Sequence, residues 1–263
     1  MATDFKKVIK QEYLKCVQEP SHFMVKYCTI QHPKKGKVKF NLYPYQEKCV
    51  TEFKNNRYNI ILKSRQLGLS TLSAGYALWM MLFHNDKNIL VIATGKDTAK
   101  NLVTKVRVMY DNLPSWLKTG TEEINKLSVR FTNGSQIKAI ASNESAGRSE
   151  ALSLLIIDEA AFIDKVGTIW TAAQQTLATG GDAIVLSTPN GVGNWFHQQW
   201  VGAESGDNEF NTIKLHWTNH PDRDESWRKE QNKILGPSQA AQECDADFLT
   251  SGQSVVDPVI LQW

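Results

Sequence analysis

The chain has 263 residues, of which 41% are hydrophobic and 22% are charged. These values exclude a wholly disordered chain, and the length allows one large domain, or one domain with a small appendage. The longest nearly apolar run, residues 74–83, is about half of a membrane span, so no transmembrane helix is expected. No secretory signal is visible, and the four cysteines form no CxxC pair, which predicts free thiols in a reducing compartment and no zinc knuckle.

The net charge of +3 hides a strong asymmetry along the chain. Residues 1–150 carry 24 Lys and Arg against 12 Asp and Glu, whereas residues 151–263 carry 6 against 15. A basic first part suits a polyanionic partner, such as nucleic acid or the phosphates of a nucleotide. An unevenly charged, solvated surface would explain the same numbers equally well.

The first third of the chain predicts an N-terminal extension followed by a strand and a helix. Residues 4–17 have helical apolar spacing, and the basic run HPKKGKVKF at 32–40 reads as a loop or hairpin rather than a phosphate contact. A short apolar run at 59–62 leads into KSRQLGLST at 63–71, and a helical stretch follows at 72–83. This is the order of a strand, a loop and a helix.

The middle of the chain continues the alternation. Residues 88–93 predict a buried strand and residues 98–113 a helix. Two alternating segments, 127–131 and 136–141, predict a β-hairpin closed by a tight Asn133-Gly134 turn.

Two further apolar runs predict central strands. LSLLII at 152–157 ends in an Asp-Glu pair, and AIVL at 183–186 ends in STPNG. Strands of this kind are buried on both faces of a parallel sheet. After about residue 205 the pattern weakens. We therefore expect one α/β domain: a mainly parallel central sheet with helices on both faces, an N-terminal helical extension and a β-hairpin.

Polar clusters follow three of the predicted strands, after residues 62, 157 and 186. Open parallel sheets bind ligands at the carboxyl ends of their strands. Three clusters far apart in sequence can therefore meet in one site.

The first cluster resembles a phosphate-binding loop. In the usual pattern G-x-x-x-x-G-K-[ST], backbone N–H groups wrap phosphates, a Lys reaches the β/γ oxygens and a hydroxyl binds Mg²⁺. Gly68 and Ser70 fit the end of the pattern, but Leu69 stands at the Lys position and Lys63 at the first Gly position. Lys63 could swing to the phosphates on its flexible stem, and Arg65 is a second cation in the loop. A plain strand–turn–helix junction is the alternative.

The second cluster is the acidic pair that ends LSLLIIDE. A carboxylate at the end of a buried strand is costly unless it binds something. The pattern predicts Asp158 as the residue that holds Mg²⁺ and Glu159 as the general base that polarises the attacking water. A solvent-facing pair is the alternative.

Three other sequence features suit the same chemistry. The hydroxyls of Ser187-Thr188-Pro189 could sense a γ-phosphate, although an ordinary turn explains them as well. The Gln46 amide could read an adenine edge, and the Tyr45 ring could stack on the base. Arg148 could be an arginine finger or a plain surface residue. A metal site at His216, His220 and Asp222 is a weaker hypothesis.

The ordered motifs YPYQ, KSRQLGLST, LSLLIIDEAAFID and LSTPNG resemble the ATPase part of a tailed-bacteriophage terminase large subunit, the DNA-packaging motor. The resemblance extends from about residue 20 to the stretch QECDADFLTSGQSV. Members usually carry Lys after SRQLG, where this chain has Leu69; some place it at the start of the loop, where Lys63 stands.

The resemblance implies a P-loop NTPase fold of the RecA-like ASCE type, with ATP and Mg²⁺ as cofactors. It implies an adenine motif at Tyr45 and Gln46, a coupling motif at 187–189, and Arg65 or Arg148 as the arginine finger. It implies catalytic or metal roles for Lys63, Asp158, Glu159 and Ser70, and nucleotide contacts by the loop residues Ser64, Gln66, Leu67, Gly68, Leu69, Ser70 and Thr71.

The resemblance also implies partners and boundaries. Expected partners are double-stranded DNA, a portal protein, a small terminase subunit and a procapsid. A ring of this chain, a pentamer, is expected when the motor assembles in the host cytoplasm, and the isolated domain could be a monomer. The expected divisions are 1–57 (extension with the adenine motif), 58–250 (ATPase core) and 251–263 (start of a linker to an absent nuclease domain). No nuclease activity is expected in this chain.

Two alternative functions share some of these features. A helicase-like nucleic-acid ATPase would share the Gln, Asp-Glu and Ser-Thr features, but about 70 residues after Asn190 are too few for a second motor domain. A nucleotide-binding assembly module with a degenerate loop is favoured by Leu69. ATP binding without turnover would indicate the module.

Overall fold

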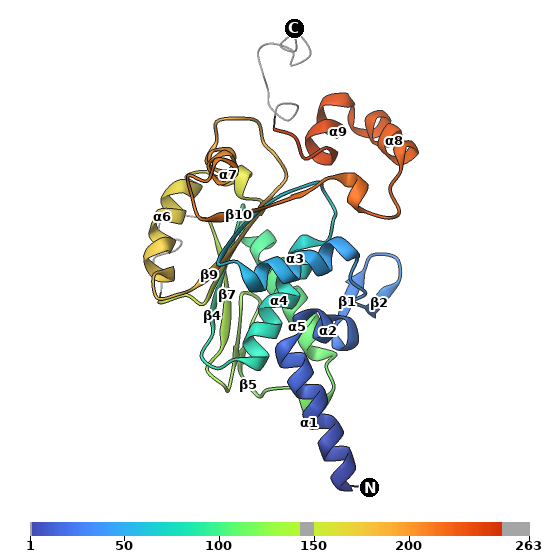
Figure 1. Ribbon diagram of the computed structural model, residues 1–263, viewed down its shortest axis with the longest axis vertical. Helices are drawn as coiled ribbons and strands as arrows, with labels where there is room; N and C mark the ends of the chain where they lie inside the picture. The colour runs from blue at the N-terminus through green and yellow to red at the C-terminus, as the bar shows by residue number, and fades with distance from the viewer. Residues whose placement is uncertain (1, 143–149, 249–263) are drawn as a thin grey trace.

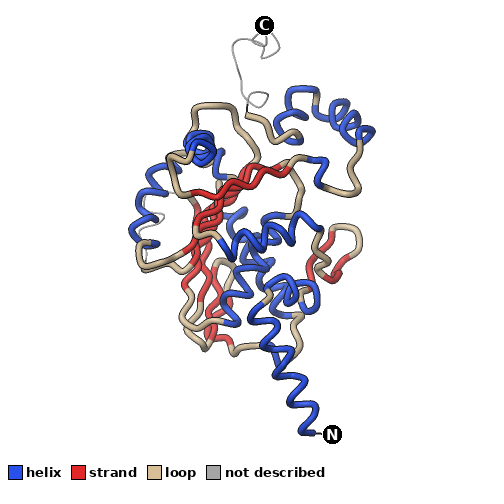
Figure 2. Tube along the Cα trace, viewed as in Figure 1, coloured by secondary structure: helices blue, strands red, loops and turns tan. Residues whose placement is uncertain are grey.

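The computed structural model describes residues 2–142 and 150–248. An eight-stranded sheet forms its centre (Figures 1 and 2). The six strands from β10 to β7 in the spatial order are parallel to their neighbours, whereas β6 and β5 are antiparallel, so the predicted mainly parallel sheet is confirmed. In spatial order the strands are β10 (Phe210–Leu215), β3 (Tyr58–Lys63), β9 (Asp182–Ser187), β8 (Leu154–Asp158), β4 (Asn88–Ala93), β7 (Gln136–Ala141), β6 (Ser128–Phe131) and β5 (Thr121–Ile124).

Helices cover both faces of the sheet (Figure 1). One apolar core lies under α4 (Leu69–Phe83) and α5 (Lys96–Asp111), and the other under α6 (Val166–Leu177) and α7 (Trp195–Ser205). Along β8, Leu154 and Ile156 belong to the first core, and Leu155 and Ile157 to the second. Since both faces are buried, every residue of this strand must be apolar until its end, which is the pattern that predicted it.

The N-terminal elements pack on the α4 side of the sheet. They are α1 (Ala2–Gln18), α2 (Pro20–Tyr27), the antiparallel pair β1 (Thr29–His32) and β2 (Gly36–Lys39), and α3 (Pro44–Asn55). The Trp79 indole donates a hydrogen bond to the Cys16 carbonyl (2.8 Å), which ties α1 to α4. The basic run at residues 32–40 was predicted to form a loop or a hairpin, and it forms a hairpin. The division at residue 57 stays a prediction, because these elements share the core with α4.

The second predicted hairpin is formed by β6 and β7. Its loop is wider than the predicted tight turn: the Gly134 N–H donates to the Phe131 carbonyl, and the Phe131 N–H donates to Ser135. Gly134 has φ +81, and a Cβ there would lie 2.1 Å from an Asp86 oxygen, so a side chain at this position would be strained and would displace Asp86. The Asn133 amide donates to the Met81 carbonyl (2.8 Å) and anchors the loop to α4.

The C-terminal part forms more structure than its sequence pattern predicts. β10 pairs in parallel with β3 over six residues. After it come three short elements, η3 (Trp217–Asn219), α8 (Glu225–Leu235) and α9 (Pro237–Cys244), the last two beyond the carboxyl end of the sheet (Figure 1). The short helices η1 (Ser115–Leu117) and η2 (Ala160–Phe162) lie in connections.

Cys16, Cys28, Cys49 and Cys244 are all buried free thiols, as predicted. In the part of the chain that the structure describes, none of the helices has the length and apolar character to cross a membrane. Residues 251–263, expected to begin a linker, lie outside the described residues.

Candidate nucleotide-binding site

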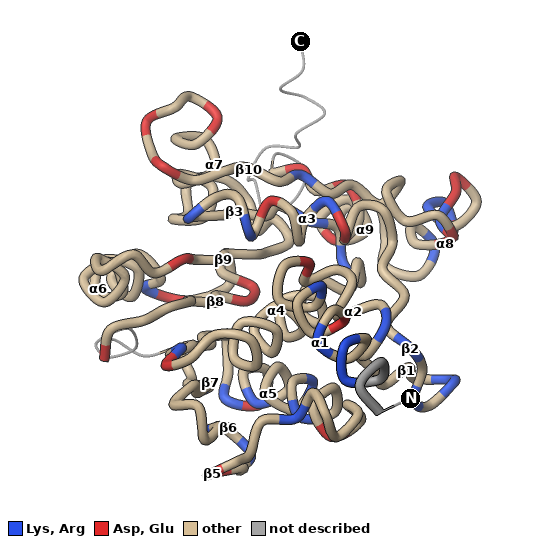
Figure 3. Tube along the Cα trace, turned by 60° about the horizontal axis from the view of Figure 1, so that its bottom comes forward, with Lys and Arg blue, Asp and Glu red and all other residues tan. Residues whose placement is uncertain are grey.

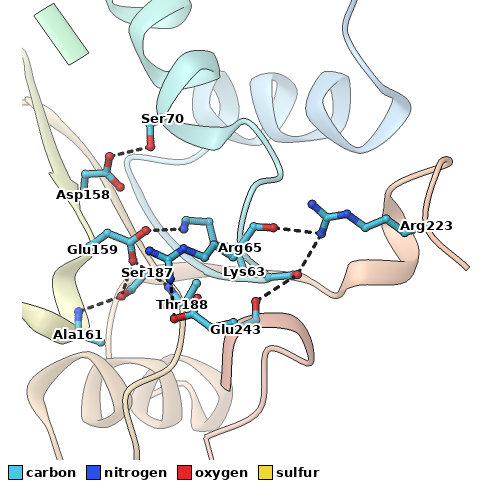
Figure 4. Close-up of polar contacts among 11 residues, drawn as sticks. Lys63, Arg65, Ser70, Asp158, Glu159, Ala161, Ser187, Thr188, Arg223 and Glu243 are labelled. Atoms are coloured by element: carbon cyan, nitrogen blue, oxygen red, sulfur yellow. Dashed lines mark hydrogen bonds and ion pairs between the residues drawn. The ribbon is translucent and has the colours of Figure 1, made fainter. Parts of the chain in front are cut away.

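Three neighbouring strands of the sheet end in polar residues at one edge. β3 ends at Lys63, β8 at Asp158 and β9 at Ser187. The register pairs Leu62 with Ser187 and Asp158 with Leu186, so the three ends lie level. Figure 4 shows the side chains that meet there. The polar clusters predicted to converge are therefore within reach of one ligand.

The phosphate loop, residues 64–68, joins β3 to α4. Three of its carbonyls are held by hydrogen bonds from side chains outside the loop. The Arg65 and Gln66 carbonyls accept hydrogen bonds from Arg223, and the Leu67 carbonyl accepts from two side chains of α3. Each carbonyl shares a planar peptide unit with the next N–H, so the N–H groups of residues 66, 67 and 68 point the other way. None of the three has an acceptor among the residues described. Such a run of N–H groups at a helix start forms an anion-binding nest.

The α3 side chains under the loop are Tyr45 and Gln46. The Tyr45 hydroxyl and the Gln46 amide nitrogen each donate to the Leu67 carbonyl at 3.0 Å, and Gln46 Oε1 accepts from the Tyr43 N–H. Gly68 has φ +73, and a Cβ there would lie 2.8 Å from Gln46 Nε2. Tyr45 and Gln46 are buried and support the loop; their contact with adenine stays a prediction.

The acidic strand end meets the start of α4. The Ser70 hydroxyl donates to Asp158 Oδ2 at 2.7 Å, whereas the buried Asp158 Oδ1 has no hydrogen-bond partner among the residues described. Burial and the nearby Glu159 charge raise the pKa of Asp158. A hydroxyl and a carboxylate with an unpartnered oxygen are hard oxygen donors, so these residues fit Mg²⁺.

Glu159 lies between the phosphate loop and β9. The Lys63 ammonium donates to Glu159 Oε1 at 2.8 Å, and the Thr188 N–H donates to Oε2 at 3.2 Å. The Lys63 side chain is 6% exposed and that of Glu159 is 30% exposed. Glu159 also has φ 56, in the left-handed region, which is uncommon for a residue with a side chain. The carboxylate is therefore held by charge and backbone contacts together.

The position usually held by the loop Lys belongs to the apolar core here. Leu69 is 2% exposed and packs among the buried residues of the α4 side. Of the two cations considered in its place, the Arg65 side chain is 65% exposed and pairs with Glu243 at 2.8 Å. Lys63 alone of these two touches the acidic pair. The geometry thus favours Lys63 as the cation of the site.

The predicted coupling motif at the end of β9 contacts the segment after Glu159. The Ser187 hydroxyl accepts from the Ala161 N–H at 3.1 Å and lies 3.5 Å from Glu159 Oε2. The Asn190 amide donates to the Ala161 carbonyl at 3.0 Å. Ser187, Thr188 and Pro189 are buried, so the motif is packed against this segment.

A cavity of about 470 Å³ is lined by residues of β1, α4 and α5. Thr71 and Lys105 both line it. Burial lowers the pKa of Lys105, and the Asp158 charge opposes that shift. Sequence reasoning missed Lys105, because a Lys on an amphipathic helix is ordinarily solvated.

Two other residues missed by sequence reasoning hold the phosphate loop from the C-terminal part of the chain. Arg223 donates to the Arg65 and Gln66 carbonyls at 3.0 and 3.1 Å, and the Glu243 carbonyl accepts from the Arg65 N–H at 2.7 Å. Ser64, buried in the loop, contacts both partners through its hydroxyl. No motif marks these residues, because they act through backbone contacts across more than 150 positions.

Two predictions remain, Arg148 and the possible metal site at His216, His220 and Asp222. Arg148 lies outside the described residues. His216 and His220 hydrogen-bond within their own turns, at Thr218 and Asp222 respectively, and do not form a ligand cluster. In the described ranges, the group spaced closely enough for a metal ion is instead Glu12, Cys16 and His22, where the Lys26 ammonium already lies 2.9 Å from the Glu12 carboxylate.

A phosphate loop at the end of β3 and an acidic pair two strands away define a phosphate-loop nucleoside-triphosphatase fold. The family model described as "Terminase large subunit, T4likevirus-type, N-terminal" matches residues 60–256. This chain therefore belongs to that terminase large subunit family.

Solved structures share this fold. The ATPase domain of the large terminase of Thermus phage P74-26 aligns with a TM-score of 0.66 and 21% identity, over 80% of this chain and 94% of that chain. The large terminase of bacteriophage HK97 aligns with a TM-score of 0.65 and 15% identity, over 89% of this chain and 50% of that one. The large terminase of a thermophilic bacteriophage, solved in complex with ATP-γ-S, aligns with a TM-score of 0.60 and 12% identity, over 78% and 52%. The chain spans about half the length of the last two.

Proposed function

We propose that this chain binds ATP with Mg²⁺ at the three strand ends and hydrolyses it, as the ATPase motor of a phage terminase that moves double-stranded DNA into a procapsid. One observation carries the proposal: Ser70 contacts Asp158, and Lys63 contacts Glu159. Two pairs of polar groups, 88 and 96 residues apart in sequence, bring the phosphate loop and the acidic strand end together.

The phosphates of ATP bind the nest at the start of α4. The N–H groups of residues 66–68 donate to phosphate oxygens, and the positive end of the α4 dipole adds to their attraction. Lys63 supplies the side-chain cation, since Leu69 is buried in the core. The Lys63 stem is flexible, so its ammonium can reach both Glu159 and a γ-phosphate.

Ser70 and Asp158 are the residues that would hold Mg²⁺. When bound, the ion neutralises charge that develops on the β- and γ-phosphates. Of the two carboxylate oxygens of Asp158, Oδ1 has no other partner among the described residues, so it is the one available to the ion.

Glu159 acts as the general base. It accepts a proton from the attacking water while the water oxygen bonds to the γ-phosphorus and the bond to the bridging oxygen of ADP breaks. Lys63 and the Thr188 N–H orient the carboxylate for this role. A carboxylate already held by these groups loses little freedom when the water arrives, which is the advantage of preorganisation.

The coupling motif passes the change at the γ-phosphate to the rest of the protein. Ser187 and Thr188 touch Glu159, and Ser187 also holds Ala161. Loss of the γ-phosphate alters the contacts of Lys63 and Glu159, and this alteration reaches the segment after β8 through Ser187. That segment leads into α6.

The DNA partner is supported by family membership and by charge. Figure 3 shows Lys and Arg along α1 and the β1–β2 hairpin. The hairpin lysines Lys34, Lys35, Lys37 and Lys39 are all exposed. Exposed lysines of this density suit a phosphate backbone, whose binding is sequence-independent and sensitive to salt. We further propose the family's portal protein, small subunit and procapsid as partners, with a ring of this chain, assembled in the host cytoplasm.

The proposal is tested by ATP hydrolysis measured with and without Mg²⁺ and linear double-stranded DNA, over a wide range of protein concentration. We expect Mg²⁺-dependent turnover. A specific activity that rises with concentration indicates that a neighbouring copy supplies a group, with Arg148 the first to substitute. Firm ATP binding without turnover under every condition would instead indicate the assembly module.

A further inference from the structure

Arg223 lies in the connection between η3 and α8 and reaches the phosphate loop from outside the sheet (Figure 4). Its guanidinium donates to the Ser64 hydroxyl at 3.3 Å, to the Arg65 carbonyl at 3.0 Å and to the Gln66 carbonyl at 3.1 Å. The same group lies 4.4 Å from the centre of the Trp227 ring. A planar fork that stacks on an indole is held in one orientation, so the three contacts are made together.

These contacts determine which way the loop's peptide units face. The Arg65 carbonyl is part of the unit that carries the Gln66 N–H, and the Gln66 carbonyl is part of the unit that carries the Leu67 N–H. Holding both carbonyls outward therefore aims both N–H groups into the nest. Gln66 has φ 59, a conformation that a free loop would seldom keep. Arg223 offsets that cost with two charge-assisted hydrogen bonds.

The next peptide unit is oriented independently. The Leu67 carbonyl is held by Tyr45 and Gln46 from α3, which aims the Gly68 N–H into the nest. Two separate parts of the chain thus orient the nest: Arg223 orients two N–H groups and α3 orients the third.

The segment that carries Arg223 is itself fixed to the loop and to its neighbours. The Glu243 carbonyl accepts from the Arg65 N–H at 2.7 Å, and its carboxylate pairs with the Arg65 guanidinium. Arg228 on α8 makes two hydrogen bonds of 2.7 Å to Asp245, just after α9. The segment that carries Arg223 is therefore held in place by hydrogen bonds and ion pairs.

From this geometry we propose that Arg223 is a positioning residue for nucleotide phosphates, which acts through the loop backbone and touches no ligand atom. The inference rests on the proposed nucleotide site. It makes a distinct claim about that site: two of the three N–H groups that bind the phosphates depend on a side chain 157 or more positions away in sequence.

The test compares Arg223→Ala and Arg223→Lys with wild type. Lys229→Ala serves as the matched control, because it removes one exposed positive charge from the same segment. Affinities for ATP, GTP, ADP and adenosine are measured by calorimetry or competition. For Arg223→Ala we expect ATP and ADP affinity to fall about tenfold together, with adenosine affinity and the ATP/GTP ratio unchanged. Arg223→Lys should fall between, because one ammonium cannot span both carbonyls.

Guanidinium ion added in solution at millimolar concentration provides a second readout. It should restore part of the ATP affinity of Arg223→Ala and have no effect on Lys229→Ala, a result that a merely structural role would not give. If Arg223→Ala fails to fold, the same affinities of Arg223→Lys decide.

Three outcomes overturn the inference. Unchanged ATP affinity in the Arg223 variants would contradict it and leave the proposed function standing. A changed ATP/GTP ratio or a loss of adenosine affinity would show that Arg223 touches the base instead. A wild-type protein that binds no nucleotide would overturn the proposed function, and the inference with it.

Discussion

The Lys63 ammonium lies 2.8 Å from Glu159 Oε1, so the side chains at the ends of β3 and β8 meet across the intervening strand β9. The contact joins the cation proposed for phosphate binding to the base proposed for hydrolysis. A triphosphate that draws Lys63 toward its own oxygens would alter the contacts of Glu159 in the same motion. In the proposed function, nucleotide binding and hydrolysis are therefore linked through one ion pair.

Removing the cation tests this pair. Lys63→Ala should lower turnover roughly 100-fold or more, because it removes a preorganised positive charge from a largely buried site. Arg65→Ala should have a much smaller effect, since the Arg65 side chain points to Glu243 and is 65% exposed. Steady-state ATP hydrolysis of the two variants measures the difference. The reverse order of effects would transfer the cation role to Arg65.

The phosphate loop should be intolerant of a side chain at Gly68. Gly68→Ala adds a Cβ at 2.8 Å from Gln46 Nε2 at a position with φ +73, so both stability and nucleotide affinity should fall. Gly193→Ala is the matched control: it has φ +84 but open space around the added Cβ, and should cost about 1 kcal/mol through backbone strain alone. Urea unfolding and ATP titration of both variants separate strain from crowding. Equal behaviour of the two would refute the role given to Gln46 beneath the loop.

Asp182 at the start of β9 should make stability depend on pH. Burial raises the pKa of Asp182 to about 6, from its ordinary value of 3.8. Between pH 4 and 6 the folded state binds this proton more tightly than the unfolded state, so the free energy of unfolding falls as pH rises through that range. Asp182→Asn should remove this fall. Its stability relative to wild type should therefore improve from pH 4 to pH 6 and stay constant above.

Urea denaturation of wild type and Asp182→Asn at several pH values checks this expectation. The exposed Asp111→Asn variant is the control and should track wild type. A constant difference in the free energy of unfolding between wild type and Asp182→Asn across the whole pH range would contradict it. The carboxyl of Asp182 would then have the same pKa in the folded and unfolded states.

Sequence reasoning succeeded where burial imposes a pattern. β3, β8 and β9 are interior strands, so their residues had to be apolar on both faces, and the polar residues that end them stood out. Parallel pairing then brought Lys63 and Asp158 to the same edge. The sheet and the convergence of its strand ends could be predicted because both follow from local composition and one topological rule.

Sequence reasoning failed for strands at the edge of the sheet and for residues that contact only the backbone of the loop. β10 has the sequence FNTIKL, which mixes polar with apolar residues. It lies at the edge of the sheet, where a strand has only one neighbouring strand and is less buried. β5 is exposed along its whole length, and its sequence TEEI has one hydrophobic residue, which is too little for a strand pattern. Arg223 and Glu243 contact loop backbone, which carries no residue-specific pattern to match. Gln46 contacts Leu67 and Tyr43 in this structure, and its contact with adenine stays a prediction.

The most direct test of the proposed chemistry is Mg²⁺-dependent ATP hydrolysis by wild type beside Glu159→Gln, with ATP affinity measured on the same samples. Asp164→Asn, an exposed carboxylate in the connection after β8, is the matched control and should behave as wild type. We expect Glu159→Gln to bind ATP like wild type and to lose turnover at least about 100-fold, because an amide cannot accept the proton of the attacking water. Turnover that survives in Glu159→Gln would contradict the role of Glu159 as the base.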